Sequence, residues 1–308
     1  LGSRLGETDW WGKAPYWRHP SSQSMIQVDI DGHNLGANKP ATLAVLADVS
    51  LFLAALAEAL EPRRASMNIE ARRTRLNKYR EKLRSERAKL DEKLKDFAVP
   101  MNPAHVAHVC QEMFPEGSVL VADGGNTAVW CMFFHEARVP NTLLSTFKFG
   151  MLGAGVAQAL GAALARPGLP VCCIIGDGAM GFHPQELETA VRNGLKVVYL
   201  VLCDKAWGMV KINQQFALHP VKTLIKKSLG PDETIKTDLG EIEFDKLAES
   251  MGAHGERVND PRELKPALER CLASGGAAVI HVDVDPVKHM WAPGLMHFKD
   301  MHLEPKGK

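Results

Sequence analysis

Four largely apolar segments, each ending in an aspartate, constrain what this chain can fold into more than any other feature. They predict strands at Val119–Asp123, Val171–Asp177, Val197–Asp204 and Ala277–Asp285. Helices are expected between and around them, at 103–114, 152–165, 184–193, 244–251 and 263–273. Because the apolar residues do not alternate with polar ones, both faces of each strand must be covered. The pattern therefore predicts an α/β fold with a doubly wound parallel sheet.

Composition and charge exclude several classes of protein. The chain has 308 residues, of which 45% are hydrophobic, and Lys+Arg 37 against Asp+Glu 36 leave a formal net charge of +1. We therefore expect no nucleic-acid partner that binds through bulk charge. No apolar run approaches the ~20 residues that a membrane-spanning helix needs, so no membrane association is expected. The six cysteines form no C-x-x-C pair, which predicts reduced core thiols and a cytoplasmic protein.

The first 61 residues resemble half of a parallel α/β unit. Strands are expected over 25–31 and 42–48, and an apolar helix over Val49–Leu60 is closed by Pro62. Two strands without a hairpin turn leave sheet edges unpaired. Since the chain also opens abruptly at Leu1, without a starting Met, we expect the remainder of this unit to lie upstream.

A highly charged segment, over 62–99, is expected to form one linker helix that ends at Pro100. Its narrow apolar stripe is made of Leu76, Tyr79, Leu83, Leu90, Leu94 and Phe97. A basic helix that binds nucleic acid is the less favoured interpretation. We expect a solvated helix that packs on its own domain or on a partner chain. The segment 290–308 is expected to be an irregular tail that covers a site or packs on a neighbour.

The chemistry is concentrated at the end of the second predicted strand of the sheet, where Asp177 lies between Gly176 and Gly178. Glycines allow backbone N–H groups to approach an anion closely. A carboxylate beside such a loop would repel a phosphate unless a cation lay between them. The combination therefore points to a hard divalent metal, most simply Mg²⁺.

A second carboxylate strengthens this interpretation. Asp204 ends the next predicted strand, one helix and 27 residues after Asp177. A helical crossover places the ends of two parallel strands at the same edge of a sheet. Both side chains are thus expected within reach of one ion, although Asp204 could also be a plain turn residue.

These residues resemble those of the thiamine-diphosphate-dependent enzymes. The match includes Gly176–Gly178, a helix that starts with Gln185-Glu186-Leu187, and an acceptor side chain 27 residues after Asp177. The stretch 202–210 is most similar to the acetolactate synthase-like branch. The resemblance extends over the whole chain. It implies the end of the family's central domain at 1–61, a linker at 62–99, a thiamine diphosphate/Mg-binding domain at 100–289, and a tail at 290–308.

The resemblance also implies the roles of individual residues. Asp177, Asp204 and the backbone carbonyl of Ala206 would bind Mg²⁺, although the family usually has Asn-Asn where this chain has Cys203-Asp204. The added negative charge is expected to lower diphosphate affinity or to require positive charge nearby. Cofactor binding is implied for Gly124, Gly125, Asn126, Thr127, Gly150, Leu152, Gly176, Gly178, Ala179, Ala206, Trp207, Gly208 and Met209. Asn126 could instead cap a helix, and core packing alone could explain Leu152.

The implied activity is decarboxylation or carboligation of a 2-oxo acid in a homodimer or homotetramer. It requires a pyrimidine-binding domain with an activating glutamate, which would come from an upstream segment or another chain. No residue here is assigned a catalytic role, because surface or core positions explain His135 and His183. FAD binding to the central domain is left open. The alternatives are an acyl-CoA lyase or decarboxylase of the same superfamily, a non-catalytic cofactor-binding subunit, and an unrelated nucleotide-binding module.

Overall fold

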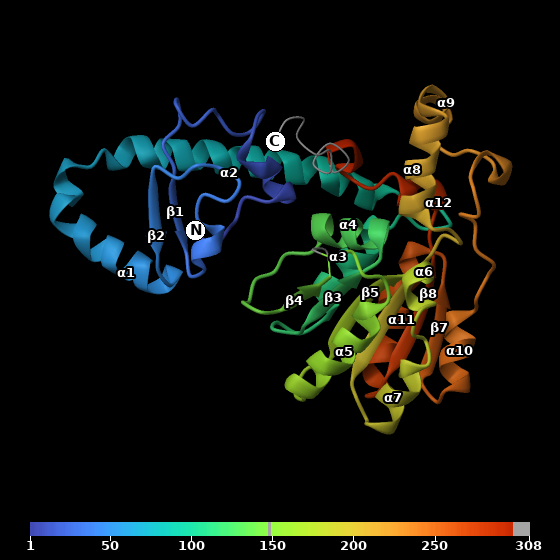
Figure 1. Cartoon of the computed structure of the whole chain (residues 1–308). Helices are drawn as coiled ribbons and strands as arrows, with labels where there is room; N and C mark the ends of the chain where they lie inside the picture. The colour runs from blue at the N-terminus through green and yellow to red at the C-terminus, as the bar shows by residue number, and fades with distance from the viewer. Residues whose placement is uncertain (147–148, 298–308) are drawn as a thin grey trace. The chain divides into compact units, whose positions relative to one another are not determined.

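The computed structural model describes residues 1–146 and 149–297 of the chain. The chain divides into two compact units, which are described separately. The smaller unit comprises residues 1–84 and 294–308, and the larger comprises residues 85–293. Both can be followed by colour along the chain in Figure 1. The tail predicted over 290–308 is described only as far as residue 297, and the rest of it lies outside the described residues.

The smaller unit contains a two-stranded parallel sheet of β1 (Ile26–Asp29) and β2 (Leu43–Leu46), as the sequence predicted. Helix α1 (Val49–Leu60) follows, and the Asp48 side chain caps it by accepting from the backbone N–H groups of Ser50 and Leu51. No residue of α1 is buried. Short 3₁₀ helices lie at Glu7–Gly12, Gly32–Asn34 and Glu61–Ser66.

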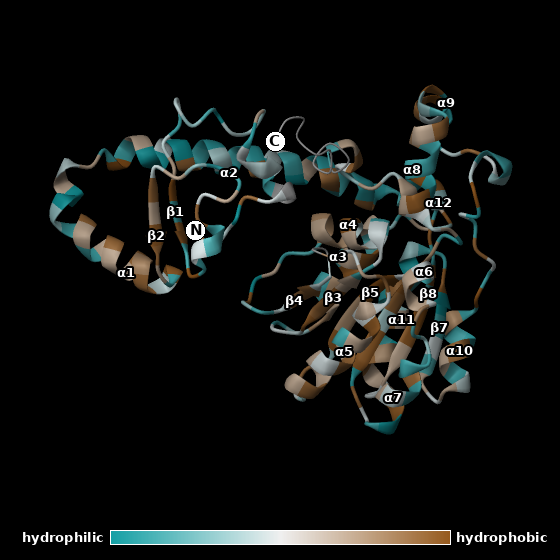
Figure 2. Ribbon diagram, in the orientation of Figure 1, coloured by the Kyte–Doolittle hydropathy of each residue, from teal (hydrophilic) through white to brown (hydrophobic). Residues whose placement is uncertain are grey.

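The charged segment forms helix α2 (Ile69–Asp91) and a 3₁₀ turn over Glu92–Lys95, so the helix ends earlier than predicted. Figure 2 shows α2 as largely hydrophilic. Of the predicted apolar stripe, Leu90 and Leu94 pack against the core of the larger unit, whereas Phe97 after them is exposed. The stripe's earlier members are exposed at Leu76, Tyr79 and Leu83.

The larger unit is built on a six-stranded sheet in which all strands are parallel, in the order β4-β3-β5-β6-β8-β7. The four predicted strands form its centre, and two edge strands were not predicted. The edge strand β4 has three residues, and β7 has a polar sequence, so neither carries a continuous apolar run. The strands are β3 (Leu120–Asp123), β4 (Leu143–Ser145), β5 (Val171–Gly176), β6 (Val197–Cys203), β7 (His254–Val258) and β8 (Ala278–Asp283).

Helices cover both faces of this sheet, which confirms the doubly wound fold (Figure 1). On one face pack α3 (Ala104–Met113), α4 (Gly125–Phe134) and α11 (Pro261–Ala273). On the other face pack α5 (Ala154–Ala165), α6 (Asp177–Met180), α7 (Glu186–Arg192) and α10 (Phe244–Ser250). After β6 come α8 (Gly208–Leu218) and α9 (Pro220–Lys226), and after β8 comes α12 (Pro286–Met290).

The pleat of the strands sorts their side chains between the two cores. Cys172 packs in one core and Cys173 in the other, as adjacent strand residues must. All six cysteines are buried and free, as expected for core thiols. Among the described residues, none of the helices combines the length and apolar character that a membrane crossing requires.

The strand order determines where a ligand can bind. From β3 the chain passes to β4 on one side and then to β5 on the other side. Ligands of open α/β sheets bind outside the carboxyl ends of the strands at such a reversal. The register also places Gly176, at the end of β5, opposite Leu202 near the end of β6. The loops that follow β3, β5 and β6 therefore meet at the carboxyl end of the sheet. Because Asp177 lies there, this end is called the Asp177 edge below.

Candidate functional site

Asp177 is held at the carboxyl end of β5 by backbone hydrogen bonds. Its Oδ1 accepts from Gly178 N at 2.7 Å, and its Oδ2 accepts from Lys205 N, in the loop after β6, at 2.8 Å. The side chain is buried. Burial, followed by the nearby Asp204 carboxylate, raises the pKa of Asp177 to about 6. Two buried acidic side chains thus act on each other here, the electrostatic setting in which a bound cation is favourable.

Asp204 follows β6 and is also buried. Its Oδ1 accepts from Ala206 N at 3.1 Å, which closes a tight turn. An antiparallel bridge between Ala206 and Asp238 holds this turn through the Lys205 carbonyl and the Trp207 amide. The Ala206 carbonyl is therefore not an acceptor in that bridge, consistent with the metal-binding role predicted for it.

The loop after β3 contacts the loop after β5 at its glycines. Gly124 has φ +91, and a Cβ there would lie 3.2 Å from Gly176 N. A side chain at position 124 would thus be strained as well as crowded. Asp123 holds the loop, since its two carboxylate oxygens accept from Gly124 N at 2.6 Å and from Gly155 N at 2.7 Å. A Cβ at Gly176 would lie 3.0 Å from Thr127 Oγ1.

Asn126 is the least satisfied polar side chain at this edge. It is 3% exposed, and neither its Nδ2 nor its Oδ1 has a hydrogen-bond partner among the described residues. It does not cap α4, because the cap position is Gly124. A Cβ at Gly208 would lie 2.7 Å from Asn126 Nδ2 and 3.1 Å from Asp204 Oδ2, so both groups face the start of α8. A buried amide without partners needs a water, an ion or a ligand to satisfy it, and Gln215 in α8 is in the same state.

The residues at the start of α8 pack against the glycines of the other two loops at the Asp177 edge. A Cβ at Gly178 would lie 2.7 Å from the Trp207 ring, and one at Gly125 would lie 2.8 Å from Met209 Cβ. These close approaches require the predicted glycines to remain without side chains. Beside them is a cavity of about 280 Å³ that Asp204, Ala206, Gly208 and Lys211 help to line.

Gly150 and Leu152 lie in the neighbouring loop, before α5. Gly150 donates its backbone N–H to the Thr146 carbonyl at 2.7 Å. Leu152 packs against the core between the sheet and its helices. A Cβ at Gly153 would lie 3.2 Å from the carbonyl of Ala179, a buried member of α6, so this loop adjoins the end of α6. Core packing accounts for Leu152, and cofactor binding by Gly150 and Leu152 stays a prediction.

His289, in α12, was not predicted as a site residue. It is 4% exposed, and its ring lies between two predicted site residues. Its Nδ1 lies 2.6 Å from Asp204 Oδ2, and its Nε2 lies 3.0 Å from Thr127 Oγ1. The sequence could have pointed to His289 only through its position. It follows the predicted strand Ala277–Asp285, whose carboxyl end reaches the Asp177 edge. This position became informative only once β8 was known to pair with β6.

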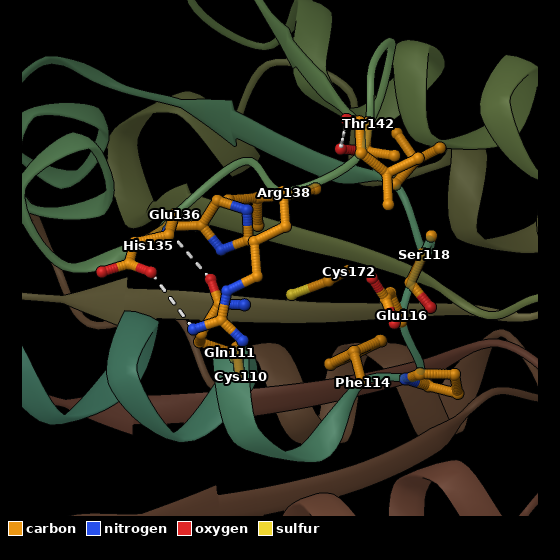
Figure 3. A pocket seen from close by; sticks show the side chains of 15 residues that line it. Cys110, Gln111, Phe114, Glu116, Ser118, His135, Glu136, Arg138, Thr142 and Cys172 are labelled. Atoms are coloured by element: carbon orange, nitrogen blue, oxygen red, sulfur yellow. Dashed lines mark hydrogen bonds and ion pairs between the residues drawn. The ribbon is translucent and has the colours of Figure 1, made fainter.

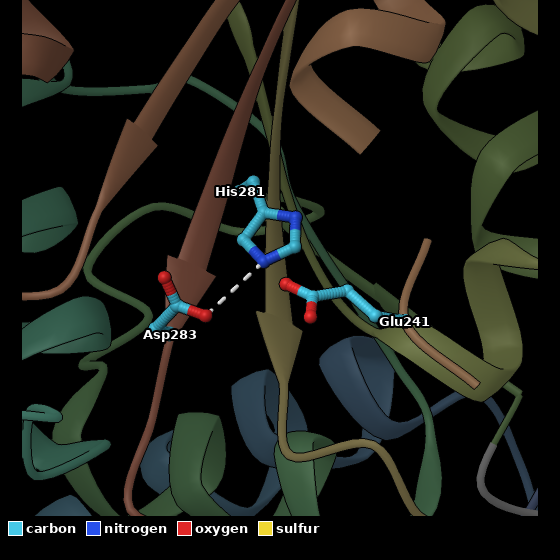
Figure 4. A group of neighbouring side chains, drawn as sticks. All are labelled: Glu241, His281 and Asp283. Atoms are coloured by element: carbon cyan, nitrogen blue, oxygen red, sulfur yellow. Dashed lines mark hydrogen bonds and ion pairs between the residues drawn. The ribbon is translucent and has the colours of Figure 1, made fainter. Parts of the chain in front are cut away.

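A second group of metal-ligating side chains, Glu241, His281 and Asp283, is drawn in Figure 4. Its carboxylates already have cationic partners, since Arg257 donates to both Glu241 and Asp283, at 2.6 to 2.9 Å. Lys205 Nζ donates to the other oxygen of Glu241 at 2.8 Å. The Lys205 and Arg257 hydrogen bonds lower the pKa of Glu241 to about 2. The group is an ion-pair network, and we assign no metal to it.

A cavity of about 240 Å³ lies at the other end of the strands (Figure 3). It is lined by residues at the start of β3 and β5, including Cys172, and by His135 and Arg138. Arg138 is paired with Glu136, and burial raises the pKa of the Cys172 thiol well above its ordinary value. His135 therefore lies away from the Asp177 edge. We assign no activity to this cavity.

The residues at the Asp177 edge fit a metal-bound diphosphate. The donor set is made of hard oxygens, as Mg²⁺ requires. The unpartnered Asn126 amide can donate to a phosphate oxygen, and the glycines at 178 and 208 keep the edge free of side chains. The structure thus brings together the loops 124–127, 176–179 and 204–209, which contain all the predicted site residues except Gly150 and Leu152.

The chain matches a known protein family and resembles several known proteins in sequence. Residues 123–282 match the family described as "Thiamine pyrophosphate enzyme, C-terminal TPP binding domain". A probable acetolactate synthase of Mycobacterium bovis is 34% identical over 193 residues, which is 63% of this chain and 33% of that protein. Acetolactate synthase 2 of Nicotiana tabacum is 26% identical over 94% of this chain and 42% of its own length.

Solved structures agree on the fold. A crystal structure of benzoylformate decarboxylase from Polynucleobacter necessarius superposes with a TM-score of 0.59 at 22% identity, covering 87% of this chain and 45% of that one. The chain spans about a third to two fifths of the length of the curated relatives named above. Because the family match covers residues 123–282, which include every predicted site residue, the chain belongs to the thiamine pyrophosphate enzymes and contains their C-terminal TPP-binding domain.

Proposed function

We propose that this chain binds the diphosphate end of thiamine diphosphate through Mg²⁺ and is the C-terminal part of an acetolactate synthase-like enzyme. Such an enzyme decarboxylates a 2-oxo acid or joins two of them. The proposal rests on the buried amide of Asn126, which has no hydrogen-bond partner among the described residues. The side chains of Asn126 and Asp204 both face Gly208, at the Asp177 edge. A fold of this type supports many reactions, so the site carries the argument.

Each part of the edge has a role in this proposal. Asp177, Asp204 and the Ala206 carbonyl hold Mg²⁺. The loops 124–127, 176–179 and 206–209 hold the diphosphate by backbone and side-chain donors, and Gly150 and Leu152 contact the organic part of the cofactor. When bound, thiamine diphosphate supplies the electron sink for the cleavage of a bond beside a carbonyl group. This chain's residues bind and orient that group and exclude water from the anion.

A second segment must complete the active site. The chain matches about a third to two fifths of its curated relatives, and none of its described residues is proposed as the acid that activates the cofactor. We propose that a pyrimidine-binding domain contributes this carboxylate, either from the same polypeptide or from another chain. The complete enzyme is then expected to be a homodimer or homotetramer of the cytoplasm, where the six buried thiols stay reduced.

Calorimetry with thiamine diphosphate and Mg²⁺ tests the binding. Wild type should bind the cofactor only when Mg²⁺ is present, and Asp177→Ala should lose this binding because the shared ion loses a ligand. Asp283→Asn is the matched control, since Asp283 ends the strand β8 but pairs with Arg257. Binding by wild type without Mg²⁺, or undiminished binding by Asp177→Ala, contradicts the proposal.

Substrate assays separate the proposed reaction from its nearest alternative. With the pyrimidine-binding segment present, turnover of pyruvate supports the acetolactate synthase-like activity. Turnover of a 2-hydroxyacyl-CoA or oxalyl-CoA, but not of pyruvate, would favour an acyl-CoA lyase or decarboxylase.

A further inference from the structure

With a diphosphate bound, the proposed metal site would contain more negative charge than one divalent cation neutralises. Asp177 and Asp204 each contribute a carboxylate, both are buried, and a bound diphosphate would add more negative charge beside them. Burial makes uncompensated charge costly, because water can no longer screen it. The site therefore requires further donors or cations that are built into the protein.

His289 is the buried side chain placed to meet this need. Its Nδ1 lies 2.6 Å from Asp204 Oδ2, a short and therefore well-defined hydrogen bond. We assign the donor role to Nδ1 and the acceptor role to the Asp204 oxygen, because an imidazole N–H can donate to a carboxyl oxygen. The other oxygen of Asp204 accepts from Ala206 N, so hydrogen bonds at both oxygens fix the orientation of this carboxylate.

Both the ring and the backbone of His289 have hydrogen-bond partners, and the helix that carries it is capped. Its Nε2 lies 3.0 Å from Thr127 Oγ1, and its backbone carbonyl accepts from Trp130 Nε1 at 3.0 Å. The Asp285 side chain caps α12 by accepting from the backbone N–H groups of Val287 and Lys288. The imidazole thus connects the loop after β6 to the start of α4 through one rigid group.

We propose that His289 is a positioning residue that orients Asp204 towards the metal and couples it to Thr127 at the start of α4. This inference rests on the proposed function, because it assigns Asp204 to the metal. It makes the carboxylate at position 204 dependent on His289, whereas a neutral amide at that position would not need the histidine. Partners that orient metal ligands commonly contribute tenfold or more to metal affinity.

The test is a double-mutant cycle on this chain, read as Mg²⁺-dependent binding of thiamine diphosphate by calorimetry. His289→Ala should weaken binding by about tenfold or more. His289→Asn, which retains an N–H donor near the Nδ1 position, should lose less. In the Asp204→Asn background, His289→Ala should cost much less than it does in wild type, because the carboxylate that it orients is gone. His281→Asn, at a buried histidine that also pairs with a carboxylate, is the control and should bind normally.

The outcomes separate this inference from the function on which it rests. Thermal unfolding without metal is measured for every variant, so that a loss of binding through misfolding is recognised. An equal loss from His289→Ala in both backgrounds, or no loss in either, overturns the role of His289 while the proposed function stands. A wild-type chain without Mg²⁺-dependent binding overturns both.

Discussion

Asn126 and Asn102 are both buried asparagines, and they differ in whether the side chain finds hydrogen-bond partners. The Asn126 amide is buried in α4 without hydrogen-bond partners among the described residues, a state that costs roughly 1–3 kcal/mol in a protein that holds no ligand. Asn102 has the same burial, but its amide donates to Asp96 and its oxygen accepts from Ala104 N. The two asparagines look alike in the sequence, and their surroundings give them opposite roles.

We predict opposite effects for the two alanine substitutions. Asn126→Ala should raise the free energy of unfolding of the ligand-free protein by about 1 kcal/mol, since it removes an unsatisfied polar group and improves helix propensity. The same change should weaken Mg²⁺-dependent binding of thiamine diphosphate. Asn102→Ala, its control, should destabilise by about 1–3 kcal/mol. Urea denaturation and calorimetry measure these effects, and a destabilised Asn126→Ala with normal binding would contradict the assignment.

At the scale of elements, short segments at the carboxyl edge depend on specific polar contacts. Helix α12, which carries His289, has only five residues. Its Lys288 pairs with Asp96, in the segment that follows α2, at 2.7 Å. Asp96 thereby links the end of the charged segment to the helix that follows β8.

The Asp96 contact predicts how stability changes in acid. The hydrogen bonds from Lys288 and then Asn102 hold the pKa of Asp96 at about 2, below its ordinary 3.8. This contribution to stability is therefore complete above pH 4 and is lost as the pH falls towards 2. In Asp96→Asn, the free energy of unfolding should fall less between pH 4 and pH 2 than it does in wild type. The difference should be on the order of 1 kcal/mol, after allowance for solvent screening. Urea titrations of wild type, Asp96→Asn and Lys288→Met between pH 2 and 5 check this, and parallel curves would refute it.

At the scale of the whole molecule, the two units differ in how much core they contain. The larger unit has a six-stranded sheet with a buried core on each face. The smaller unit has a two-stranded sheet, and none of the residues of its helix α1 is buried. A two-stranded sheet alone is marginally stable at best.

We predict that residues 85–293 fold on their own and that residues 1–84 do not. The isolated 85–293 fragment should show cooperative urea unfolding and the α/β circular dichroism of the full chain. The 1–84 fragment should show no cooperative transition, because it cannot bury enough apolar surface to offset its chain entropy. A cooperative transition in the 1–84 fragment, or its absence in the 85–293 fragment, would refute this division.

The amino-acid pattern predicted the central strands and the two carboxylates because short apolar runs between helical segments, each ending in a polar residue, are typical of the middle of a parallel sheet. The edge strands β4 and β7 carry no such run, and half-buried residues can form either strand or loop. Helices α8 and α9 were not predicted either. Only Ile212, Gln215 and Thr223 are buried in them, so the apolar stripe that identifies a helix is weak.

The sequence by itself determined the fold class and the residues at the strand ends, since hydrophobic period and strand-end chemistry are local properties. Only the tertiary structure decided which of those residues meet. Strand order placed the end of β8 beside β6, and this brought His289 to Asp204 across 85 positions of the chain. Packing also left the Asn126 amide without partners among the described residues. Such contacts depend on how distant segments converge, which no local pattern of residues encodes.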